Sequence, residues 1–397
     1  MNSAAHGRPA APLVSVVMAN YQAGDRIIPA MRSVLAQTMA DLELIVSDDG
    51  SNDTSLAHIS RLMAEDSRVH LLTAEANGGP ARCRNRALDM ARGHWIAIVD
   101  SDDIIHPERF ERLLAAAGQH DADIVADDLL LFFEDGTAPR LMLGEGTDRC
   151  FVVSPEQWVR AGVDGSPALG YLKPMIRSSR LGALRYDEKL RIGEDYDLVL
   201  RLLLDGASLL VVPEPFYLYR RHSGSISHRL PIADMEAMVA RQQALVDAHA
   251  PLDPALSAAF AQRLRNLRQG LSYERLVASI KTRRWPAALA ALAGNPNHVR
   301  RLWRSFNEGR GRRQVLPPHQ LSPLLMLGAS ETAGTTDPVP AYLPAAATDW
   351  SAPRPRQVWR ALAARRGLGA IRCIPLDAAG RYAAGFIPEA EVVREPS

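Results

Sequence analysis

Three carboxylates stand close together after one short apolar stretch of the chain. Asp100, Asp102 and Asp103 follow the run Trp95–Val99, whose composition predicts a buried strand. Carboxylates this close repel one another unless a cation lies between them, and their oxygens are ligands that Mg²⁺ and Mn²⁺ favour. A divalent ion here would neutralise a diphosphate and stabilise its departure as a Lewis acid. The alternative, that an aspartate caps a helix opening near Pro107, accounts for one carboxylate but not for three.

The segment Asp48–Thr54 carries further aspartates within a run of turn-forming residues. It lacks the spacing and the terminal glutamate of an EF-hand, which argues against calcium. An aspartate here could accept a hydrogen bond from the ring N–H of uracil. Turn chemistry alone explains the composition, and for this segment taken by itself it is the preferred interpretation.

A pair of glycines, Gly78 and Gly79, enters a predicted helix that carries Arg82 and Arg84 in its first turns. Glycine permits a close approach of the backbone, a helix N-terminus favours anions, and arginine can clamp a phosphate. Neither GxGxxG nor GxxxxGK[ST] occurs in the chain, which argues against a dinucleotide-binding fold and a P-loop. A plain helix start is an equally good local interpretation.

Two later segments carry groups suited to catalysis. Gly193–Asp197 opens a predicted helix, and acids in a first turn are favoured by the helix dipole whatever their function. Asp195, backed by Glu194, is also what a general base requires. His222 follows two arginines in a Gly/Ser-rich loop, which suits a ligand for a metal ion or a diphosphate, although a lone histidine is usually structural.

Alternating apolar patterns predict how these groups are positioned. We expect repeated β-α-β units with short connections, forming a mostly parallel sheet flanked by helices. The strands are predicted over residues 13–18, 42–46, 69–73, 95–99 and 123–133, and the helices over 27–37, 55–64, 80–92, from 107 onward and over 194–204. Ligands bind at the carboxyl ends of the strands of such sheets, where the polar segments fall.

Length and composition restrict the partners, the localisation and the domain organisation that we expect. The chain has 397 residues with 46 Lys+Arg and 45 Asp+Glu, so net charge gives no sign of a nucleic-acid partner. Its three cysteines are far apart, and no signal-peptide or membrane-spanning pattern is found, so we expect a cytoplasmic protein. We expect a flexible N-terminus (1–12), a catalytic domain (13–230), a helical basic region (231–313) and a loosely structured Pro/Ala-rich region (314–397).

Taken together and in this order, the motifs resemble those of family-2 inverting glycosyltransferases with the GT-A fold, over residues 13 to about 230. The chain is also similar to glycosyltransferases of succinoglycan-type exopolysaccharide synthesis. The matching segments are Val14–Tyr21, Ser33–Gln37, Asp48–Asp53, Gly79–Asn85, Asp100–Asp103, Gly193–Asp195 and His222–Ser227.

The resemblance implies a role for each matching position. Ala19, Tyr21 and Asp49 would border the uracil of a UDP-sugar, and Arg84 would lie near the nucleotide. Asp100 would touch the ribose, and Asp102 would hold Mn²⁺ or Mg²⁺. Asp195 would be the general base beside Glu194 in the substrate site, while His222 would complete the metal or diphosphate site.

The resemblance also implies the reaction. A hexose, expected to come from UDP-glucose, would be transferred with inversion to a glycan or a polyprenyl-diphosphate-linked oligosaccharide during exopolysaccharide or cell-surface polysaccharide synthesis. Gln22 replaces the usual asparagine after Tyr21, which should be harmless. The QxxRW motif and the membrane helices of processive synthases are absent, which favours transfer of a single sugar.

Two other classes of protein remain as alternatives. A sugar nucleotidyltransferase needs a Gly-rich, Arg-bearing loop after its first strand, and here the loop Ala19–Arg26 has one glycine. A non-catalytic nucleotide-sugar or glycan-binding protein should have lost carboxylates, whereas Asp102 and Asp195 are both present.

The segment Phe260–Arg313 is strongly basic, with thirteen Lys/Arg against two acids. Its basic side chains could form a solvated, Arg-rich helical surface that pairs with acids of the catalytic domain. No recognition motif supports nucleic acid. The third interpretation is peripheral docking on anionic lipid at the inner face of the bacterial inner membrane.

Overall fold

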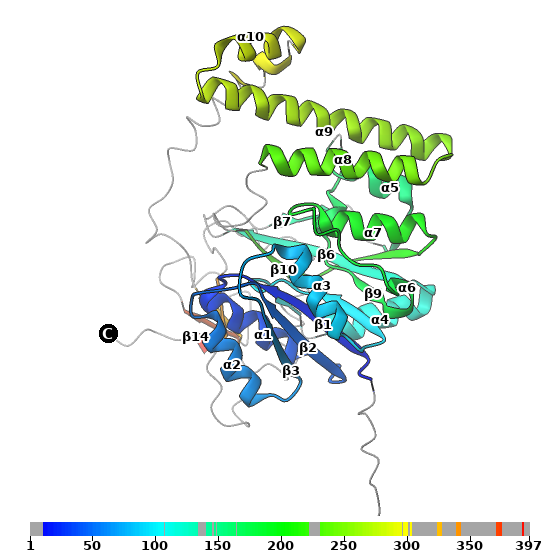
Figure 1. Cartoon of the computed structure of the whole chain (residues 1–397). Coiled ribbons are helices and arrows are strands. Elements are labelled where there is room, and N and C mark those ends of the chain that lie inside the picture. Colours follow the sequence, from blue (N-terminus) through cyan, green and yellow to red (C-terminus); the bar gives the residue numbers. More distant parts are fainter. Residues whose placement is uncertain are drawn as a thin grey trace, which may run out of the picture.

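The computed structural model describes most of the first 303 residues. The described ranges are 11–106, 108–133, 140–144, 147, 149–163, 165–221, 231–295, 297–300 and 302–303, together with the backbone of four short strands further on. Within them a central β-sheet is covered by helices on both faces, and a group of helices lies beyond one side of this layered unit (Figure 1). The predicted α/β class with a helical region after it is confirmed.

The first half of the sheet follows the predicted alternation. Its four strands run parallel in the order β3-β2-β1-β4. The elements are β1 (Val14–Asn20), α1 (Ile27–Leu35), β2 (Leu42–Asp48), α2 (Ser55–Glu65), β3 (Val69–Thr73), α3 (Pro80–Met90) and β4 (Trp95–Ile98). Almost every residue of β1 and all of β2 are buried, as expected for strands covered on both faces.

Beyond β4 the sheet becomes mixed, with the order β4-β9-β6-β10-β5. Here β9 is antiparallel to both of its neighbours, whereas β6 and β10 are parallel to each other. The elements are β5 (Ile104–Ile105), α4 (Arg109–His120), β6 (Ile124–Phe133), β7 (Arg140–Leu141), β8 (Phe151–Val153), α5 (Pro155–Arg160), β9 (Met175–Arg177), α6 (Ser178–Leu181), α7 (Glu194–Leu204) and β10 (Leu209–Arg221).

The long strand β10 contains an irregularity that the sequence explains. Its register against β6 shifts between Val212 and Tyr217, where Pro213 and Pro215 cannot donate ladder hydrogen bonds. Past this point β10 continues along β6 and also pairs with β5. It therefore reaches the chain segment that follows β4.

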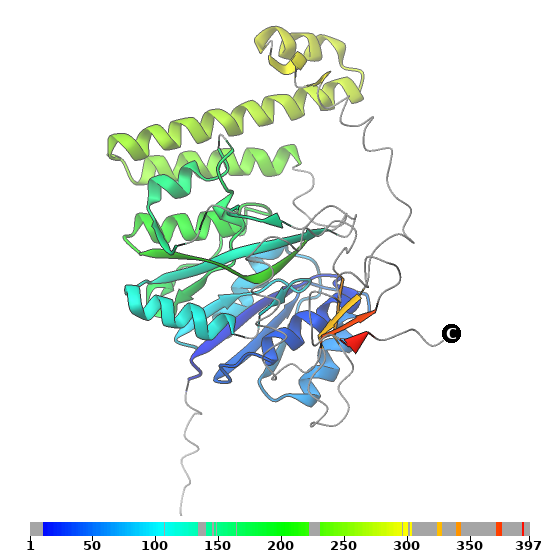
Figure 2. The same ribbon diagram turned by 180° about the vertical axis from the view of Figure 1, so that it is seen from behind.

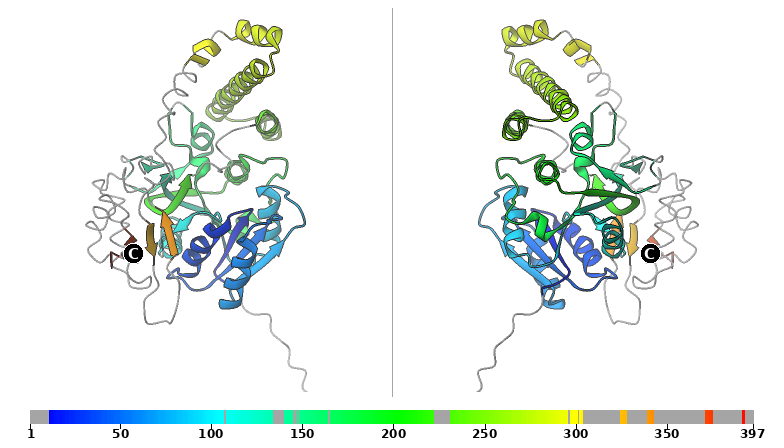
Figure 3. Two further views of the ribbon diagram at one scale, coloured as in Figure 1. Left: turned by 90° about the vertical axis from the view of Figure 1, so that its left-hand side faces the viewer. Right: turned by 90° about the vertical axis from the view of Figure 1, so that its right-hand side faces the viewer.

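Three helices follow the sheet. They are α8 (Ile232–Ala248), α9 (Pro254–Lys281) and α10 (Trp285–Gly294), and they stack on the side of the molecule occupied by α5 and α7 (Figures 1 and 3). Asp253 caps α9, because its Oδ1 accepts from the N–H groups of Ala255 and Leu256 at 2.9 and 3.1 Å. No helix of the described residues is long and apolar enough to cross a membrane.

The predicted domain boundary near residue 230 lies outside the described residues. Within the region 314–397 only four short strands are described, which form a separate small sheet in the order β12-β11-β13-β14 (Figure 2). They are β11 (Leu324–Leu327), β12 (Val339–Tyr342), β13 (Ile371–Ile374) and β14 (Glu391–Val392).

A fully buried ion pair joins α4 to the sheet. Arg109 Nη2 lies 2.8 Å from Asp127 Oδ1, and neither side chain is exposed. The same guanidinium donates to the carbonyl of Lys173 and lies over the ring of Tyr217 at 4.9 Å. Burial raises the pKa of Asp127 although Arg109 opposes this. The pair therefore fixes the loop before β9 and the start of the second half of β10.

Removing one partner of this pair should destabilise the protein strongly. Asp127→Ala leaves the Arg109 charge buried without its counter-ion, and we expect a loss of about 3–5 kcal/mol in the free energy of unfolding. The double variant Arg109→Met, Asp127→Leu should lose less, because no charge remains buried. Urea denaturation followed by circular dichroism measures both. A loss below about 1 kcal/mol for Asp127→Ala would contradict this account.

Candidate active site

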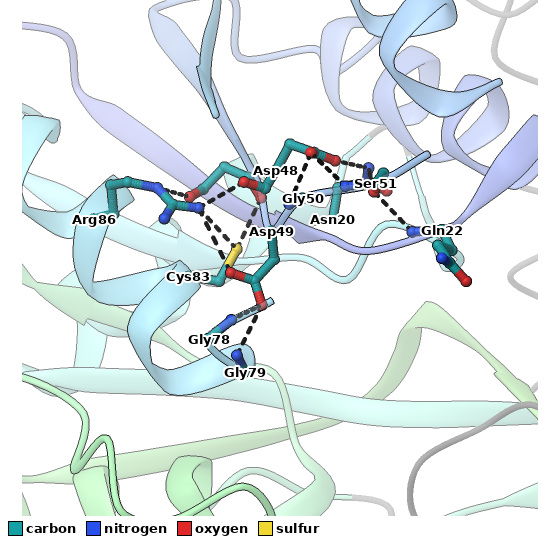
Figure 4. Close-up of polar contacts among 11 residues, drawn as sticks. Asn20, Gln22, Asp48, Asp49, Gly50, Ser51, Gly78, Gly79, Cys83 and Arg86 are labelled. Atoms are coloured by element: carbon teal, nitrogen blue, oxygen red, sulfur yellow. Dashed lines mark hydrogen bonds and ion pairs between the residues drawn. The ribbon is translucent and has the colours of Figure 1, made fainter. Parts of the chain in front are cut away.

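The first aspartate of the β2 turn has a structural task. Asp48 Oδ2 accepts from the N–H groups of Gly50 and Ser51 at 3.1 and 2.9 Å, and its Oδ1 accepts from Asn20 Nδ2 at 2.6 Å (Figure 4). These bonds close the turn after β2 and tie it to the end of β1. For Asp48, the turn interpretation is sufficient.

Asp49 is held differently. Its Oδ2 accepts from the N–H groups of Gly78 and Gly79 at 2.9 and 2.8 Å, at the start of α3 (Figure 4). Its Oδ1 is buried and has no hydrogen-bond partner among the described residues; the nearest cation, Arg86 Nη2, is 3.9 Å away. A fixed carboxylate with an unused acceptor is what recognition of a ring N–H requires.

The end of β1 lies beside this carboxylate. The N–H of Asp49 donates to the carbonyl of Asn20 at 2.9 Å. Ala19 and Tyr21 are the residues on either side of Asn20 in the chain. Ala19 is half-buried and Tyr21 is exposed. The structure thus brings together the three positions expected to border the base.

The carboxylates after β4 have separate surroundings. Asp103 is buried and accepts from the Tyr217 hydroxyl at 2.8 Å and from the N–H of Arg220 at 2.7 Å. Burial, and then the charges of Asp102 and Asp100, raise its pKa well above the ordinary value. Asp103 therefore joins the segment after β4 to β10, which is a structural task.

The charge of Asp100 is balanced by two cations of the protein itself. Its Oδ1 lies 2.9 Å from Arg84 Nη2, and its Oδ2 lies 2.8 Å from Lys173 Nζ. Burial alone would raise the pKa of Asp100, but these cations outweigh burial and hold it well below its usual range. For Asp100 the cation that balances the repulsion among the three aspartates is thus supplied by side chains of the protein itself.

The same two cations hold the start of α7. Arg84 Nη1 lies 2.7 Å from Glu194 Oε1 and 3.4 Å from Asp195 Oδ1, and Lys173 Nζ lies 3.0 Å from Asp195 Oδ2. Burial, and then the charge of Asp195, raise the pKa of Glu194 to about 7 despite Arg84. We call Arg84, Lys173, Asp100, Glu194 and Asp195 together the charge cluster.

The sequence analysis did not assign two basic residues of this site, Arg86 and Lys173. Arg84, expected near the nucleotide, is buried with its guanidinium directed at carboxylates, whereas Arg86 is the arginine beside Asp49. Arg86 donates to Ser47 Oγ and to the carbonyl of Asp48 (Figure 4). Lys173 was missed altogether. The one available signal was its rarity, because the chain has three lysines among 46 basic residues.

Metal binding can be tested against the donors present. Among the described residues no group of three or more His, Cys, Asp or Glu side chains is arranged to hold a metal ion. Asp102 is half-buried, unlike the fully buried Asp103, and His222 lies outside the described residues. A single carboxylate suits Mg²⁺ or Mn²⁺ when substrate phosphates and water supply the other ligands. The donor set therefore fits an ion that binds together with a diphosphate.

The chain matches known proteins over the region that carries these residues. The family model described as "Glycosyl transferase family 2" matches residues 15–163. The succinoglycan biosynthesis protein ExoO of Rhizobium meliloti is 34% identical over 295 residues, covering 73% of this chain and 84% of that protein. Glycosyltransferase GlyG of Streptococcus pneumoniae is 30% identical over 221 residues, covering 54% of this chain and 72% of that protein.

A solved structure shares the fold. The crystal structure of S. aureus TarS residues 1–349 in complex with UDP-GlcNAc aligns with a TM-score of 0.53 at 21% identity, covering 70% of this chain and 79% of that one. The predicted GT-A architecture is thereby confirmed. With 34% identity to ExoO over most of both chains and the family match across β1 to α5, this chain belongs to glycosyl transferase family 2 and is a glycosyltransferase.

Proposed function

We propose that this glycosyltransferase transfers a single hexose, with inversion, from a UDP-sugar to a glycan or polyprenyl-diphosphate-linked oligosaccharide. UDP-glucose is the proposed donor, and the proposed role is exopolysaccharide or cell-surface polysaccharide synthesis. The observation that carries the proposal is the carboxylate of Asp195, held by Lys173 and Arg84 beside Asp100. The relatedness to ExoO supports the biological role, and family membership favours this reaction over nucleotidyl transfer.

The donor's base would lie at the ends of β1 and β2. Asp49 Oδ1, which has no hydrogen-bond partner among the described residues, would accept the N–H of uracil, and Ala19 and Tyr21 would border the ring. Asp100 would accept from a ribose hydroxyl, because each carboxylate oxygen can accept a second hydrogen bond beyond its cation. The complex of TarS with UDP-GlcNAc supports a nucleotide-sugar donor for this fold.

The diphosphate of the UDP-sugar would bind near Asp102. We assign this carboxylate as the protein's ligand for Mn²⁺ or Mg²⁺ and His222 as a further ligand or diphosphate contact. When bound, the ion supplies Lewis-acid stabilisation of the departing diphosphate. Arg220 Nε donates to the carbonyl of Asp102 at 2.7 Å, which fixes the backbone that carries the carboxylate.

The acceptor would be activated at α7. Asp195 takes the proton of the acceptor hydroxyl while that oxygen bonds to C1 of the sugar from the face opposite UDP. The bond from C1 to the diphosphate oxygen breaks, and UDP leaves with the electron pair. Lys173 acts as a positioning residue, because its ammonium group holds Asp195 Oδ2 at 3.0 Å. Glu194 shares Arg84 with Asp195 and lies within the substrate site.

Replacing the proposed base should slow turnover without weakening donor binding. We expect Asp195→Asn to lower kcat about 10²–10⁴-fold, the usual contribution of a general base, with the Kd for UDP unchanged. UDP release in the presence of acceptor measures kcat, and calorimetry measures Kd. Asp205→Asn, at the exposed far end of α7, is the matched control. Unchanged turnover in Asp195→Asn would exclude it as the base.

The metal assignment has its own test. Asp102→Asn should abolish turnover while leaving the thermal unfolding temperature unchanged, because the side chain is only half-buried. In the unaltered protein, excess EDTA should stop UDP release, and added Mn²⁺ should restore it. Full activity in EDTA would refute metal dependence, whereas activity of Asp102→Asn equal to that of Asp205→Asn would move the metal ligand elsewhere.

Base recognition by Asp49 predicts an altered nucleotide preference. In Asp49→Asn the amide oxygen can still accept from Gly78 and Gly79, which turns an NH₂ donor toward the position of Oδ1. That donor opposes the N–H of uracil but matches the ring nitrogen acceptor of cytosine. We expect UDP affinity to fall about 5- to 150-fold, as for one buried unpaired polar group, and CDP affinity to fall less. Calorimetry with both nucleotides measures this, and equal losses for UDP and CDP would contradict direct readout.

A further inference from the structure

The segment 281–303 comprises the last residue of α9, the helix α10 and the turn after it. This segment has an unusual composition. It contains Lys281, Arg283, Arg284, Arg300 and Arg301 and not one aspartate or glutamate. It lies at the end of the helical group far from the sheet (Figures 1 and 3). We call it the α10 tip.

The α10 tip also exposes large apolar side chains. Trp285, Leu289, Val299 and Trp303 are 57%, 65%, 56% and 70% exposed. They are four of the eight strongly exposed large apolar residues in the part of the chain that the structure describes. Trp285 and Leu289 are four residues apart on α10 and therefore share a face, while Ala288 is buried.

Three of the four arginines earlier in α9 have partners within the protein. Arg263 lies over the ring of Tyr196 at 3.8 Å, Arg268 donates to Gln243 at 3.2 Å, and Arg275 pairs with Glu236 at 2.6 Å. Of these three partners only Glu236 is an acid, and it belongs to α8, so these contacts stabilise the helical region without the expected pairing to acids of the catalytic domain.

At the α10 tip the situation is different. Lys281, Arg283, Arg284 and Arg300 are exposed, and none of them forms an ion pair with a described residue. Among the described residues of the basic segment, unpaired positive charge and exposed large apolar side chains therefore occur together at the α10 tip.

We propose that the α10 tip docks on an anionic lipid bilayer, with Trp285, Leu289 and Trp303 entering the interfacial layer and the basic side chains contacting lipid headgroups. Tryptophan favours the membrane interface, and helices that lie on membranes combine an apolar face with flanking Lys and Arg. Positive charge near an anionic surface adds to the binding free energy. The proposal does not depend on which sugar or acceptor the enzyme uses.

Two other occupants fit the tip less well. A nucleic acid would cover the basic side chains but would leave Leu289 and Val299 in water. A second copy of the chain would bring two tips of the same positive charge together. An anionic bilayer satisfies both the charges and the apolar side chains.

Vesicle flotation of the full chain tests the proposal. We expect binding to vesicles of phosphatidylglycerol and phosphatidylcholine at low salt, release at high salt, and no binding to phosphatidylcholine alone. Trp285→Ala with Leu289→Ala should reduce the bound-to-free ratio by about tenfold or more, and Arg284→Gln with Arg300→Gln should do so at low salt. All four side chains are exposed, so unfolding temperatures should not change.

The matched control is Met63→Ala with Val152→Ser, which removes exposed apolar side chains elsewhere and should leave flotation unchanged. Equal flotation on neutral vesicles, no flotation on anionic ones, or full flotation of the Trp285/Leu289 variant would overturn the proposal. Concentration-dependent dimerisation lost in that variant, or RNA binding without flotation, would assign the tip to those partners instead. UDP release in solution is read separately, so a failure of docking is distinguishable from a failure of the proposed reaction.

Discussion

The geometry of the charge cluster depends on two buried cations placed among three carboxylates. Arg84 comes from α3 and Lys173 from the loop before β9, while Asp100 follows β4, and Glu194 and Asp195 begin α7. Arg84 and Glu194 are 110 residues apart in the chain. Removing one of the two cations leaves a carboxylate buried without compensation, which costs several kcal/mol. The parallel half of the sheet, its mixed half and α7 must therefore come together for all of these charges to be balanced.

Helices α8 and α9 also contact the N-terminal end of α7, the end that carries Glu194 and Asp195. Arg241 of α8 lies 2.6 Å from Asp197, and Arg263 of α9 covers the ring of Tyr196, which stacks in turn on Trp158. These residues come directly after Asp195 in the chain. Helices α8 and α9 thus contribute to the position of the proposed base, and they also carry the α10 tip. Any surface to which the tip binds would take up a defined orientation relative to α7.

Local patterns predicted the first half of the fold because its elements are marked by local chemistry. The apolar runs of β1, β2 and β4 and the glycine pair before α3 can each be recognised without knowing the rest of the chain. The charge cluster could not be assembled this way. Asp100 and Asp103 have the same side chain, and the partners that separate them, Lys173 and Tyr217, lie 73 and 114 residues further on. Which aspartate binds a cation and which fixes the backbone is therefore decided by tertiary contacts.

The raised pKa of Glu194 follows from the charge balance of the cluster. Two cations face three carboxylates, so the cluster is neutral when one carboxyl carries a proton. Burial and the neighbouring Asp195 direct that proton to Glu194, whose pKa is about 7, whereas Lys173 and Arg84 keep Asp100 ionised. Because the folded state holds this proton more tightly than the unfolded state, Glu194 contributes a loss of stability as pH rises from about 4.5 toward 7. Below about pH 7 this proton removes the charge of Glu194, and Arg84 is then the counter-ion of Asp195 and Asp100 alone.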